Sequence, residues 1–387
     1  MKFYYSLENV GKEDYAYLET RGNSYLVISN LSNEEVPFMA EEVFFDNEED
    51  CERSASNMCE YNYLELRSAC VRVDMKVGKF KDVENIPMPP MPDVKHYSCG
   101  SDDYDGEKSN GELMESFIQR IVDDPDLPNI KHLRLGAYSN PWDDDFFDGT
   151  LASMQADGLI KNASKFQHLE SLYIGDIDPP YADISGLPNG NYAELLKALP
   201  NLKSFTMKGQ PGKLTVEGEV LNLPNLEELQ IITGGLYKHV VAELQSAQLP
   251  NLRKLVICTG IENYGLDVSI KEICGLAQKS RFPSLKYLGI VNSEEQNEIA
   301  ALLIDSDIIA QLEVLDLSFG TFRDEGGQML LDNAEKLSHL KVIVDWHFLS
   351  DEMIEKLNAS PVEVQLSQQQ NPDVYGGETY YYSMITE

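Results

Sequence analysis

The most regular feature of the chain is an apolar pattern that recurs through its last two thirds. The pattern is Leu-x-x-Leu-x-Leu, in which the last two apolar positions lie two residues apart. Side chains two apart in a strand point to the same face, so each unit predicts one short strand with that pair turned inward. A unit of this kind cannot bury its apolar face alone. The pattern therefore predicts stacked units that share one continuous core, as in a solenoid.

Seven units carry the pattern, and their first positions are Ile130, Leu169, Leu202, Leu226, Leu252, Leu285 and Leu312. Successive first positions are 39, 33, 24, 26, 33 and 27 residues apart. Repeats of this class run about 20 to 29 residues, so three of the steps hold insertions. The phrase Leu-Pro-Asn-Leu, or a near copy, introduces most units, as at 199–202 and 249–252. We predict that this phrase marks the entry to a strand.

Between the predicted strands, apolar residues three and four apart indicate helices. Ile299, Leu302 and Leu303 are one such set, and a helix over 112–122 is expected where a solenoid needs an amino-terminal cap. Because a parallel sheet needs its apolar face covered, we expect the helices to lie on its outer side. An eighth unit fits at 337–342, although neighbouring apolar residues leave its register open.

Residues 1–86 lack the repeat and predict a small α+β domain. Short aromatic and β-branched runs separated by turn signals indicate antiparallel strands. These runs are Lys2–Leu7, Tyr15–Glu19 and Ser24–Leu31; a helix-like stretch follows at Glu49–Tyr61, and apolar alternation returns at Val71–Val77. A linker over 87–111 begins with a proline-rich run and continues with polar residues, so we expect the repeats and their caps to occupy 112–387.

The repeated residues, such as Leu226, Leu229 and Ile231, resemble those of the leucine-rich repeat family over about residues 112–366. Within that family the chain looks most similar to uncharacterised bacterial cytoplasmic leucine-rich repeat proteins. The resemblance implies an α/β solenoid with a parallel sheet on its concave face and helices on its convex face. It also implies a cytoplasmic location and partner recognition on the concave face.

The chain departs from the family pattern three residues after the last strand leucine, where an asparagine is usual. Those positions hold Tyr138, Ile177, Gln210, Gly234, Gly260, Ser293 and Gly320. We therefore expect no asparagine ladder, in which side-chain amides satisfy buried backbone groups. The glycines predict tight backbone turns instead.

The amino-terminal layout, strands followed by the run 44–51 and a helix, faintly resembles the WGR domain of nucleic-acid-associated proteins. The Trp-Gly-Arg signature is absent, since the comparable strand reads Tyr25-Leu26-Val27-Ile28-Ser29. The resemblance implies an alternative function, a nucleic-acid-associated adaptor. The charge of the chain argues against it.

The chain is strongly acidic, with 31 Lys and Arg against 65 Asp and Glu and a formal net charge of −34. Such a field repels phosphate backbones and anionic lipid, so nucleic-acid and membrane partners are not expected, although a small basic patch would be compatible with the composition. The amino terminus lacks a secretory apolar run, and no segment reaches the roughly 20 apolar residues that span a bilayer. The six cysteines are irregularly spaced, as in reduced cytoplasmic proteins.

One row of side chains points away from the inward leucines, and this face of a solenoid usually binds partners. Four apolar members of the row, Ile232, Val256, Cys258 and Val291, would form an exposed patch unless the inserted segments fold over it. We expect this patch to anchor a protein or peptide. The expected partner-binding residues are Arg134, Tyr173, Gln230, Ile232, Val256, Cys258, Val291 and Asp316.

No motif in the sequence names a reaction. A Gly-x-Ser-x-Gly elbow and a dinucleotide glycine fingerprint are missing, and the histidines lack metal-ligand spacing. Two acidic insertions, 140–148 and 176–183, match no EF-hand loop. We expect a non-catalytic scaffold without cofactor or metal that recognises an unknown protein or peptide. An enzyme whose site is assembled by the fold remains an alternative.

Two aromatic runs lie near the carboxyl end, Trp346–Phe348 and Tyr380–Tyr382. We expect the first to close the apolar end of the stack. The tyrosines of the second predict either a further seal or a partner epitope, because a tyrosine ring is apolar while its hydroxyl is polar.

Overall fold

The structure is a computed structural model that describes residues 109–136, 150–176 and 184–384, together with the backbones of eight strands before residue 109. The chain divides into two compact units. The first holds Met1–His96 with Asn129–Arg134, and the second holds Tyr97–Pro128 with Leu135–Glu387. The predicted boundaries at 86 and 112 stay predictions, since most of the residues between them lie outside the described part.

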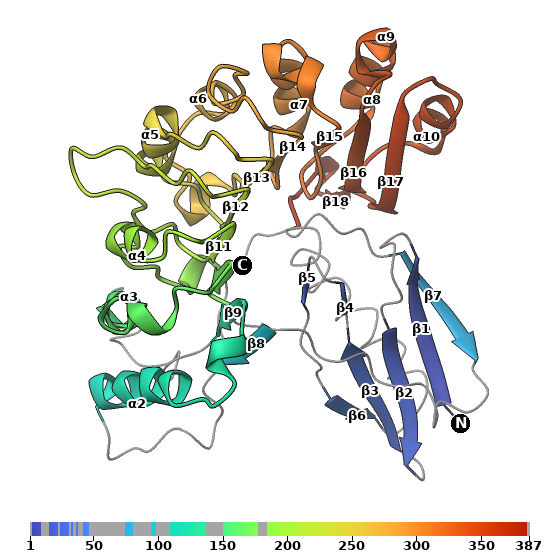
Figure 1. Cartoon of the computed structure of the whole chain (residues 1–387). Coiled ribbons are helices and arrows are strands. Elements are labelled where there is room, and N and C mark those ends of the chain that lie inside the picture. Colours follow the sequence, from blue (N-terminus) through green and yellow to red (C-terminus); the bar gives the residue numbers. More distant parts are fainter. Residues whose placement is uncertain are drawn as a thin grey trace. The chain divides into compact units, whose positions relative to one another are not determined.

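The amino-terminal strands form a five-stranded sheet in the order β6-β3-β2-β1-β7, and its neighbouring strands are all antiparallel (Figure 1). The strands of this region are β1 Lys2–Glu8, β2 Tyr15–Arg21, β3 Ser24–Asn30, β6 Glu42–Phe45 and β7 Asp74–Lys79, with β4 Ser32–Asn33 and β5 Val36–Pro37 paired separately. The first three predicted strands are confirmed. The helix expected at 49–61 lies outside the described residues, as does the start of the alternation at Val71.

The repeats build a ten-stranded sheet in the order β17 to β8, in which the nine strands β9 to β17 run parallel and in chain order (Figure 1). Its strands are β8 Val94–Tyr97, β9 His132–Leu135, β10 Ser171–Ile174, β11 Ser204–Lys208, β12 Glu228–Ile232, β13 Lys254–Cys258, β14 Tyr287–Val291, β15 Val314–Asp316, β16 Lys341–His347 and β17 Glu363–Gln369. The predicted register is confirmed, because Leu229 pairs with Leu255 and Leu255 with Leu288, and all three are buried. This is the α/β architecture expected of a leucine-rich-repeat-like solenoid.

Helices alternate with the strands and lie along one side of the sheet (Figure 1). They are α2 Asn110–Val122, α3 Thr150–Lys161, α4 Ala193–Ala198, α5 Lys238–Ser246, α6 Ile270–Cys274, α7 Gln296–Ile304, α8 Asp324–Asp332, α9 Ala334–Leu337 and α10 Asp351–Asn358, with short 3-10 turns at Leu127–Asn129, Ala163–Lys165, Ile184–Gly186, Glu262–Tyr264 and Asp307–Gln311. None of the described helices is long and apolar enough to cross a membrane.

The predicted cap helix is confirmed and begins at Asn110, just before the expected residue 112. Ser109 is its N-cap and accepts a hydrogen bond from the Glu112 backbone at 3.4 Å, while the Glu112 carboxylate accepts one from the Ser109 backbone at 2.9 Å. This reciprocal capping box satisfies two of the otherwise unpaired donors at the helix start. The helix then buries Phe117 and Ile121 toward the core.

The eighth unit is also confirmed, and the structure fixes its register. Leu315 of β15 pairs with Val342 of β16, so Val342 and Val344 are the inward pair, and both are fully buried. Leu340 takes the place of the first leucine, which shortens the approach to the strand by one residue relative to Leu312.

The structure contains a side-chain ladder at the strand entry, a different place from the positions after the strand, which hold no asparagine. Asn225 Nδ2 donates to the Pro200 carbonyl at 2.9 Å, and Asn251 Nδ2 donates to the Pro224 carbonyl at 2.7 Å. Ser284 Oγ continues the series to the Pro250 carbonyl at 2.7 Å. The Leu-Pro-Asn-Leu phrase therefore supplies both the donor of one repeat and the acceptor of the previous one.

The same slot, immediately before the first leucine, is polar in the other units. Asn201 donates to the Gln167 carbonyl at 2.7 Å, and Gln311 donates to the Phe282 carbonyl at 2.7 Å. A ring nitrogen of His168 lies 2.7 Å from the Leu127 carbonyl, and one of His339 lies 3.0 Å from the Ile309 carbonyl. Several side-chain types thus serve one purpose, which is to join a repeat to its predecessor.

Removing three rungs of this ladder should weaken the fold moderately. We expect the triple variant Asn201→Ala/Asn225→Ala/Asn251→Ala to lose about 2 kcal/mol of unfolding free energy, because a net intramolecular hydrogen bond contributes roughly 0.5–1.5 kcal/mol and water partly replaces exposed ones. Urea denaturation followed by circular dichroism measures this. Asn263→Ala, at an exposed position away from the ladder, is the control; equal midpoints for both variants would show that the ladder carries no stability.

The tight turns predicted after the strands are confirmed at two glycines. Gly260 has a φ of +64°, and a β-carbon there would lie 1.7 Å from the Gly234 carbonyl oxygen. At Gly320 a β-carbon would lie 2.4 Å from the Ser293 carbonyl oxygen. These turns bring the backbones of neighbouring repeats too close for any side chain.

Aromatic side chains close the carboxyl end of the stack, as the sequence predicts. Phe348 packs edge-on against Tyr381 and Tyr382, with ring centroids 5.2 and 5.6 Å apart. Trp346 meets Tyr382 at 6.2 Å, and the Arg323 guanidinium lies 4.8 Å from the Tyr381 ring centroid. Two of the three consecutive tyrosines therefore form the seal, whereas Tyr380 is 48% exposed.

Candidate functional site

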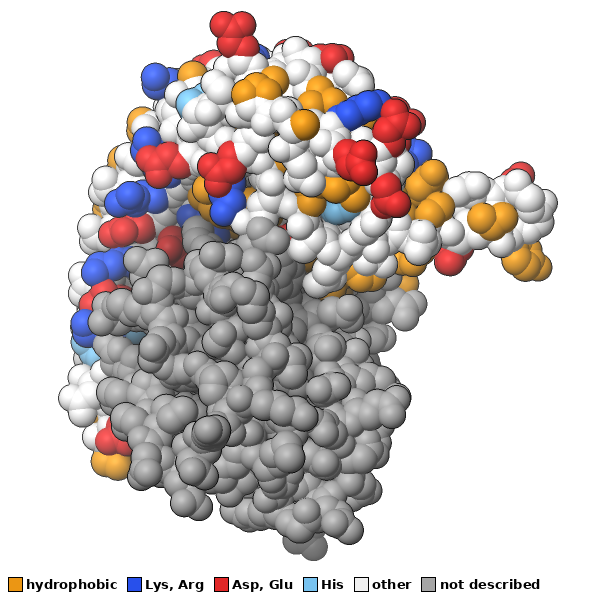
Figure 2. All heavy atoms as spheres, turned by 90° about the vertical axis from the view of Figure 1, so that its right-hand side faces the viewer, with side chains coloured by type: hydrophobic (Ala, Val, Ile, Leu, Met, Phe, Trp, Pro, Cys, Tyr) orange, Lys and Arg blue, Asp and Glu red, His pale blue; other side chains and the backbone are white. Residues whose placement is uncertain are grey.

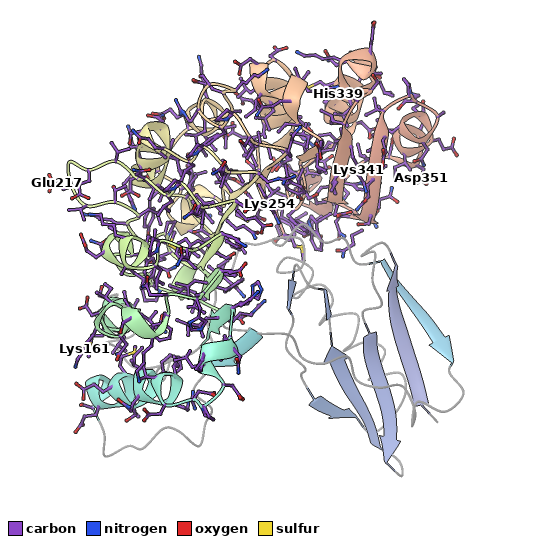
Figure 3. All side chains as sticks on the ribbon, viewed as in Figure 1. Lys161, Glu217, Lys254, His339, Lys341 and Asp351 are labelled. Carbon is purple, nitrogen blue, oxygen red and sulfur yellow. The ribbon has the colours of Figure 1, made fainter. Side chains whose placement is uncertain are left out.

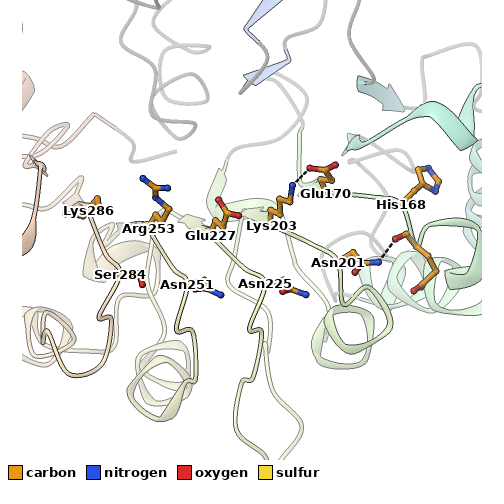
Figure 4. Close-up of a pocket in the computed structure, with 11 residues that line it drawn as sticks. His168, Glu170, Asn201, Lys203, Asn225, Glu227, Asn251, Arg253, Ser284 and Lys286 are labelled. Atoms are coloured by element: carbon orange, nitrogen blue, oxygen red, sulfur yellow. Dashed lines mark hydrogen bonds and ion pairs between the residues drawn. The ribbon is translucent and has the colours of Figure 1, made fainter.

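An open groove of about 830 Å³ crosses the strand entries of successive repeats (Figure 4). We call it the entry groove. It is lined by Gln167, His168, Glu170, Asn201, Lys203, Asn225, Glu227, Asn251, Arg253, Ser284 and Lys286. Every lining residue belongs to the short segment that leads into a strand. The groove is therefore a direct product of the repeat, and each unit adds one polar side chain and one or two charged or polar neighbours to it.

The charged residues of the groove follow the first leucine of each unit and are held in a row by the backbone. Lys203 N donates to the Glu170 carbonyl at 2.7 Å, Glu227 N to the Lys203 carbonyl at 2.7 Å, and Arg253 N to the Glu227 carbonyl at 2.7 Å. Lys286 N continues the row to the Arg253 carbonyl at 2.8 Å. Consecutive charged residues thus stand at the entries of neighbouring parallel strands, which lie roughly 4.8 Å apart in the hydrogen-bonding direction.

The charges in this row are not all neutralised. Lys203 Nζ lies 2.6 Å from Glu170, and this hydrogen bond raises the pKa of Lys203. Lys286 Nζ lies 3.1 Å from Glu313. Arg253 forms no ion pair with any residue that the structure describes. The exposed guanidinium of Arg253 is therefore available to a ligand.

The groove reverses the charge balance of the protein. Its lining includes three cationic side chains, Lys203, Arg253 and Lys286, and only two carboxylates, Glu170 and Glu227. The whole chain carries about twice as many acidic as basic residues. The small basic patch that the composition allows is therefore found here. The asparagine amides in the floor of the groove already donate hydrogen bonds to the ladder carbonyls.

The structure places the sequence-predicted partner-binding residues on the sheet but buries all of them. They are Arg134, Tyr173, Gln230, Ile232, Val256, Cys258, Val291 and Asp316, each with at most 8% of its surface exposed. The expected exposed apolar patch at Ile232, Val256, Cys258 and Val291 is thus contradicted. The predicted register of these residues was correct, and their side chains point away from the inward leucines. They are nevertheless buried from solvent. The binding role assigned to them stays a prediction.

Two of these buried side chains, Val256 and Asp316, belong to a cluster on and just after β13 to β15. Tyr287 donates through its hydroxyl to Asp316 Oδ2 at 2.6 Å, and Asp316 Oδ1 accepts from the Ser318 backbone at 3.1 Å. Lys254 Nζ lies 5.2 Å from the Tyr287 ring centroid. The Val256 side chain lies beside Gly289. In Figure 3, Lys254 lies on the sheet, whereas Lys161 and Glu217 lie on the outer, helical side. This cluster is a polar part of the interior.

Other reactive groups of the described part are buried away from the groove. Burial raises the pKa of the Cys274 thiol to about 12, and the nearby Glu298 charge adds to this shift. Burial lowers the pKa of His347 to about 4, although the Asp345 carboxylate acts in the opposite direction. Within the described residues no three His, Cys, Asp or Glu side chains are placed to hold a metal ion. The acidic insertions 140–148 and 177–183 lie outside those residues.

The entry groove was not predicted from the sequence, because the polar positions before each strand were assigned no role in binding. The signal was present: the residue after the first leucine is Glu170, Lys203, Glu227, Arg253 and Lys286 in consecutive units. Charge at a fixed slot of a repeat predicts a charged row once parallel stacking is accepted.

No protein-family model and no curated protein matches the chain. Among solved structures, the crystal structure of an uncharacterised protein from Bacteroides fragilis is similar to it, with 27% sequence identity and a TM-score of 0.67. The match covers 100% of this chain and 99% of that one. The chain is thus similar along its whole length, the amino-terminal region as well as the repeats, to a bacterial protein.

Proposed function

We propose that the protein is a non-catalytic recognition scaffold of the leucine-rich repeat class, and that its entry groove binds an extended, carboxylate-bearing segment of a partner protein. The observation that carries this proposal is the exposed Arg253 guanidinium, which has no ion-pair partner among the described residues, in the middle of a groove that crosses successive repeats. The leucine-rich repeat assignment rests on the register of the buried leucines and on the repeat lengths.

The entry groove is a better binding surface than the sheet face proposed from sequence. Lys203 and Arg253 are exposed, whereas Val256 and Asp316 have only 5% and 2% of their surface exposed. A partner reaches the groove without opening the fold. Binding at the sheet face would first require the separation of packed side chains, which costs the hydrophobic burial that they contribute.

The chemistry of the groove favours a carboxylate. Arginine presents a planar set of donors that matches a carboxylate in bidentate fashion, and such charge-assisted pairs are stronger than neutral hydrogen bonds. Lys203 and Lys286 flank Arg253, so the local field attracts anionic side chains although the protein as a whole repels them. Glu170 and Glu227, which also line the groove, limit the attraction and favour a partner whose charges are spaced along a strand.

Photo-crosslinking tests this function. The protein with a photo-crosslinking residue in place of Asn225, which leaves Arg253 intact, should form discrete adducts with acidic segments of one or a few proteins in the producing cells. A crosslinker in place of Lys336, an exposed lysine of α9, should not form them. Identical adducts from both positions, or none from the groove, would contradict the proposal.

A matched pair of variants separates the groove from net charge. With the crosslinker in place of Asn225 in the groove floor, the adducts should fall at least tenfold in the double variant Lys203→Glu/Arg253→Glu, because two favourable charge contacts become repulsive. Lys271→Glu/Lys336→Glu makes the same change in formal charge on exposed residues outside the groove and should retain them. An equal loss in both variants would show that only the total charge matters.

A further inference from the structure

We infer that the hairpin of β18 (Asp373–Tyr375) and β19 (Glu378–Tyr380) is a docking arm for a partner protein whose surface presents arginine or lysine side chains. The hairpin lies after the last strand of the repeat sheet and belongs to neither large sheet. It is separate from the entry groove in position and opposite to it in charge.

The hairpin carries three of the four exposed large hydrophobic side chains of the described part. Val374, Tyr375 and Tyr380 are 71%, 82% and 48% exposed, and among large hydrophobic side chains of the described residues only Val220, at 44%, joins them in the exposed class. Figure 2 shows hydrophobic side chains on a narrow arm that projects from the described surface. Exposed apolar side chains that cluster in this way mark interaction sites more often than scattered ones do.

The pairing of the two strands places aromatic rings and carboxylates on one face. Asp373 is opposite Tyr380, and Tyr375 is opposite Glu378, with Val374 and Thr379 paired between them. Directly opposite residues share a face, and alternate residues of a strand share it too, so both tyrosines and both carboxylates lie together. The Tyr380 hydroxyl donates to Glu378 at 2.7 Å, which holds ring and carboxylate side by side.

This combination suits a guanidinium or ammonium group. A cation binds over a tyrosine ring through the quadrupole of the ring, and it pairs with a carboxylate through charge-assisted hydrogen bonds. The protein makes the first of these contacts elsewhere, where the Arg323 guanidinium lies 4.8 Å from the Tyr381 ring centroid. On the hairpin no described cation occupies the corresponding place.

The charge of the region selects the same class of partner. No Lys, Arg or His follows Lys356 in the sequence, whereas Glu363, Asp373 and Glu378 do. Nucleic acid and anionic lipid bring phosphates and are repelled, and a second copy of this chain, with a formal charge of −34, is repelled as a whole although its entry groove is locally basic. A basic protein surface is attracted.

The arm is held ready for binding at both of its ends. Gly376 and Gly377 have φ values of +61° and +87°, as a two-residue hairpin turn requires. Tyr381 and Tyr382, directly after β19, pack against Phe348 and anchor the base. An isolated two-stranded hairpin is only marginally stable in water, so this anchoring lowers the ordering cost that a partner would otherwise meet.

The test uses the full chain and a labelled nine-residue synthetic peptide of alternating arginine and serine, followed by fluorescence anisotropy. We expect saturable binding that weakens about tenfold in Tyr375→Ser/Tyr380→Ser, a change that leaves the net charge unaltered. Val220→Ser, which removes the exposed apolar residue outside the hairpin, should stay within about twofold of the wild type. Equal affinities for all three proteins, or no saturable binding, would overturn the inference.

A second pair of measurements guards against a misfolded arm and against self-association. Asp373→Lys/Glu378→Lys should weaken arginine-peptide binding further and should create binding to the corresponding aspartate-serine peptide, a gain that a collapsed hairpin would not show. A photo-crosslinker in place of Val374, which leaves both tyrosines intact, should yield adducts whose captured peptides contain Arg or Lys. Adducts that consist of two copies of this chain, or captured peptides that are acidic, would refute the choice of partner.

Discussion

Gly260→Ala should destabilise the protein by roughly 2–5 kcal/mol, the largest loss that we expect from a single methyl group. Two costs add. An alanine in the left-handed region costs about 1–2 kcal/mol, and forced overlap in a packed interior costs about 1–3 kcal/mol or more. The new β-carbon would lie 1.7 Å from the Gly234 oxygen and 2.0 Å from the Gly234 carbonyl carbon. Both atoms belong to the backbone, so no rotamer change relieves the clash.

Gly218→Ala is the matched control for this variant. Gly218 also has a positive φ, +82°, but a β-carbon there meets nothing within 4 Å. Its cost should be about 1 kcal/mol, which reflects backbone strain alone. Urea unfolding of the two variants therefore separates conformational strain from the close approach of repeats. If Gly260→Ala unfolds at the same urea concentration as Gly218→Ala, the two backbones are not in the contact described.

Acidification from pH 6.5 to pH 4 should remove about 3 kcal/mol of unfolding free energy through His347 alone. Burial lowers the pKa of His347 from 6.5 to about 4, and its Nδ1 accepts a hydrogen bond from the Leu349 backbone at 3.3 Å. Above pH 6.5 the imidazole is neutral in both states, so the stability is fully present. Below it the unfolded chain binds a proton that the folded chain rejects until about pH 4, and each pKa unit corresponds to 1.36 kcal/mol.

His347→Gln isolates this contribution, because glutamine does not titrate. The difference in unfolding free energy between wild type and variant should change by about 3 kcal/mol across that interval, with the wild type losing more as the pH falls. His339→Gln is the control, since this exposed side chain keeps a donor for the Ile309 carbonyl. Parallel pH profiles for wild type and His347→Gln would mean that the folded protein already tolerates the imidazolium.

The repeat fold could be predicted from the sequence because its determinants are local and recur. Leu229, Leu255 and Leu288 stand two residues before a second apolar residue, and this spacing alone fixes which side chains enter the core. The register of the eighth unit could not be settled in this way. Val342, Ile343 and Val344 are all apolar, and only the pairing of Leu315 with Val342 decides between them.

The candidate site was harder to predict because burial depends on contacts that a strand pattern does not contain. Val256 points away from the inward leucines, as expected, yet it has only 5% of its surface exposed. Arg253, three positions before it, is exposed and lines the groove. A period of two assigns a side chain to one face of a sheet, whereas solvent exposure is decided by everything packed against that face.

The entry ladder gives the stack a direction. Asn225, Asn251 and Ser284 each donate to a carbonyl of the preceding repeat. A nascent chain emerges from the ribosome with its amino end first. The last repeat that has folded therefore leaves only carbonyl acceptors of the ladder without a partner, and water satisfies exposed carbonyls at little cost. Each new repeat carries the side-chain donor that bonds it to the preceding repeat. Assembly from the amino end never leaves a ladder donor without its acceptor, so the repeats can be added one by one during translation.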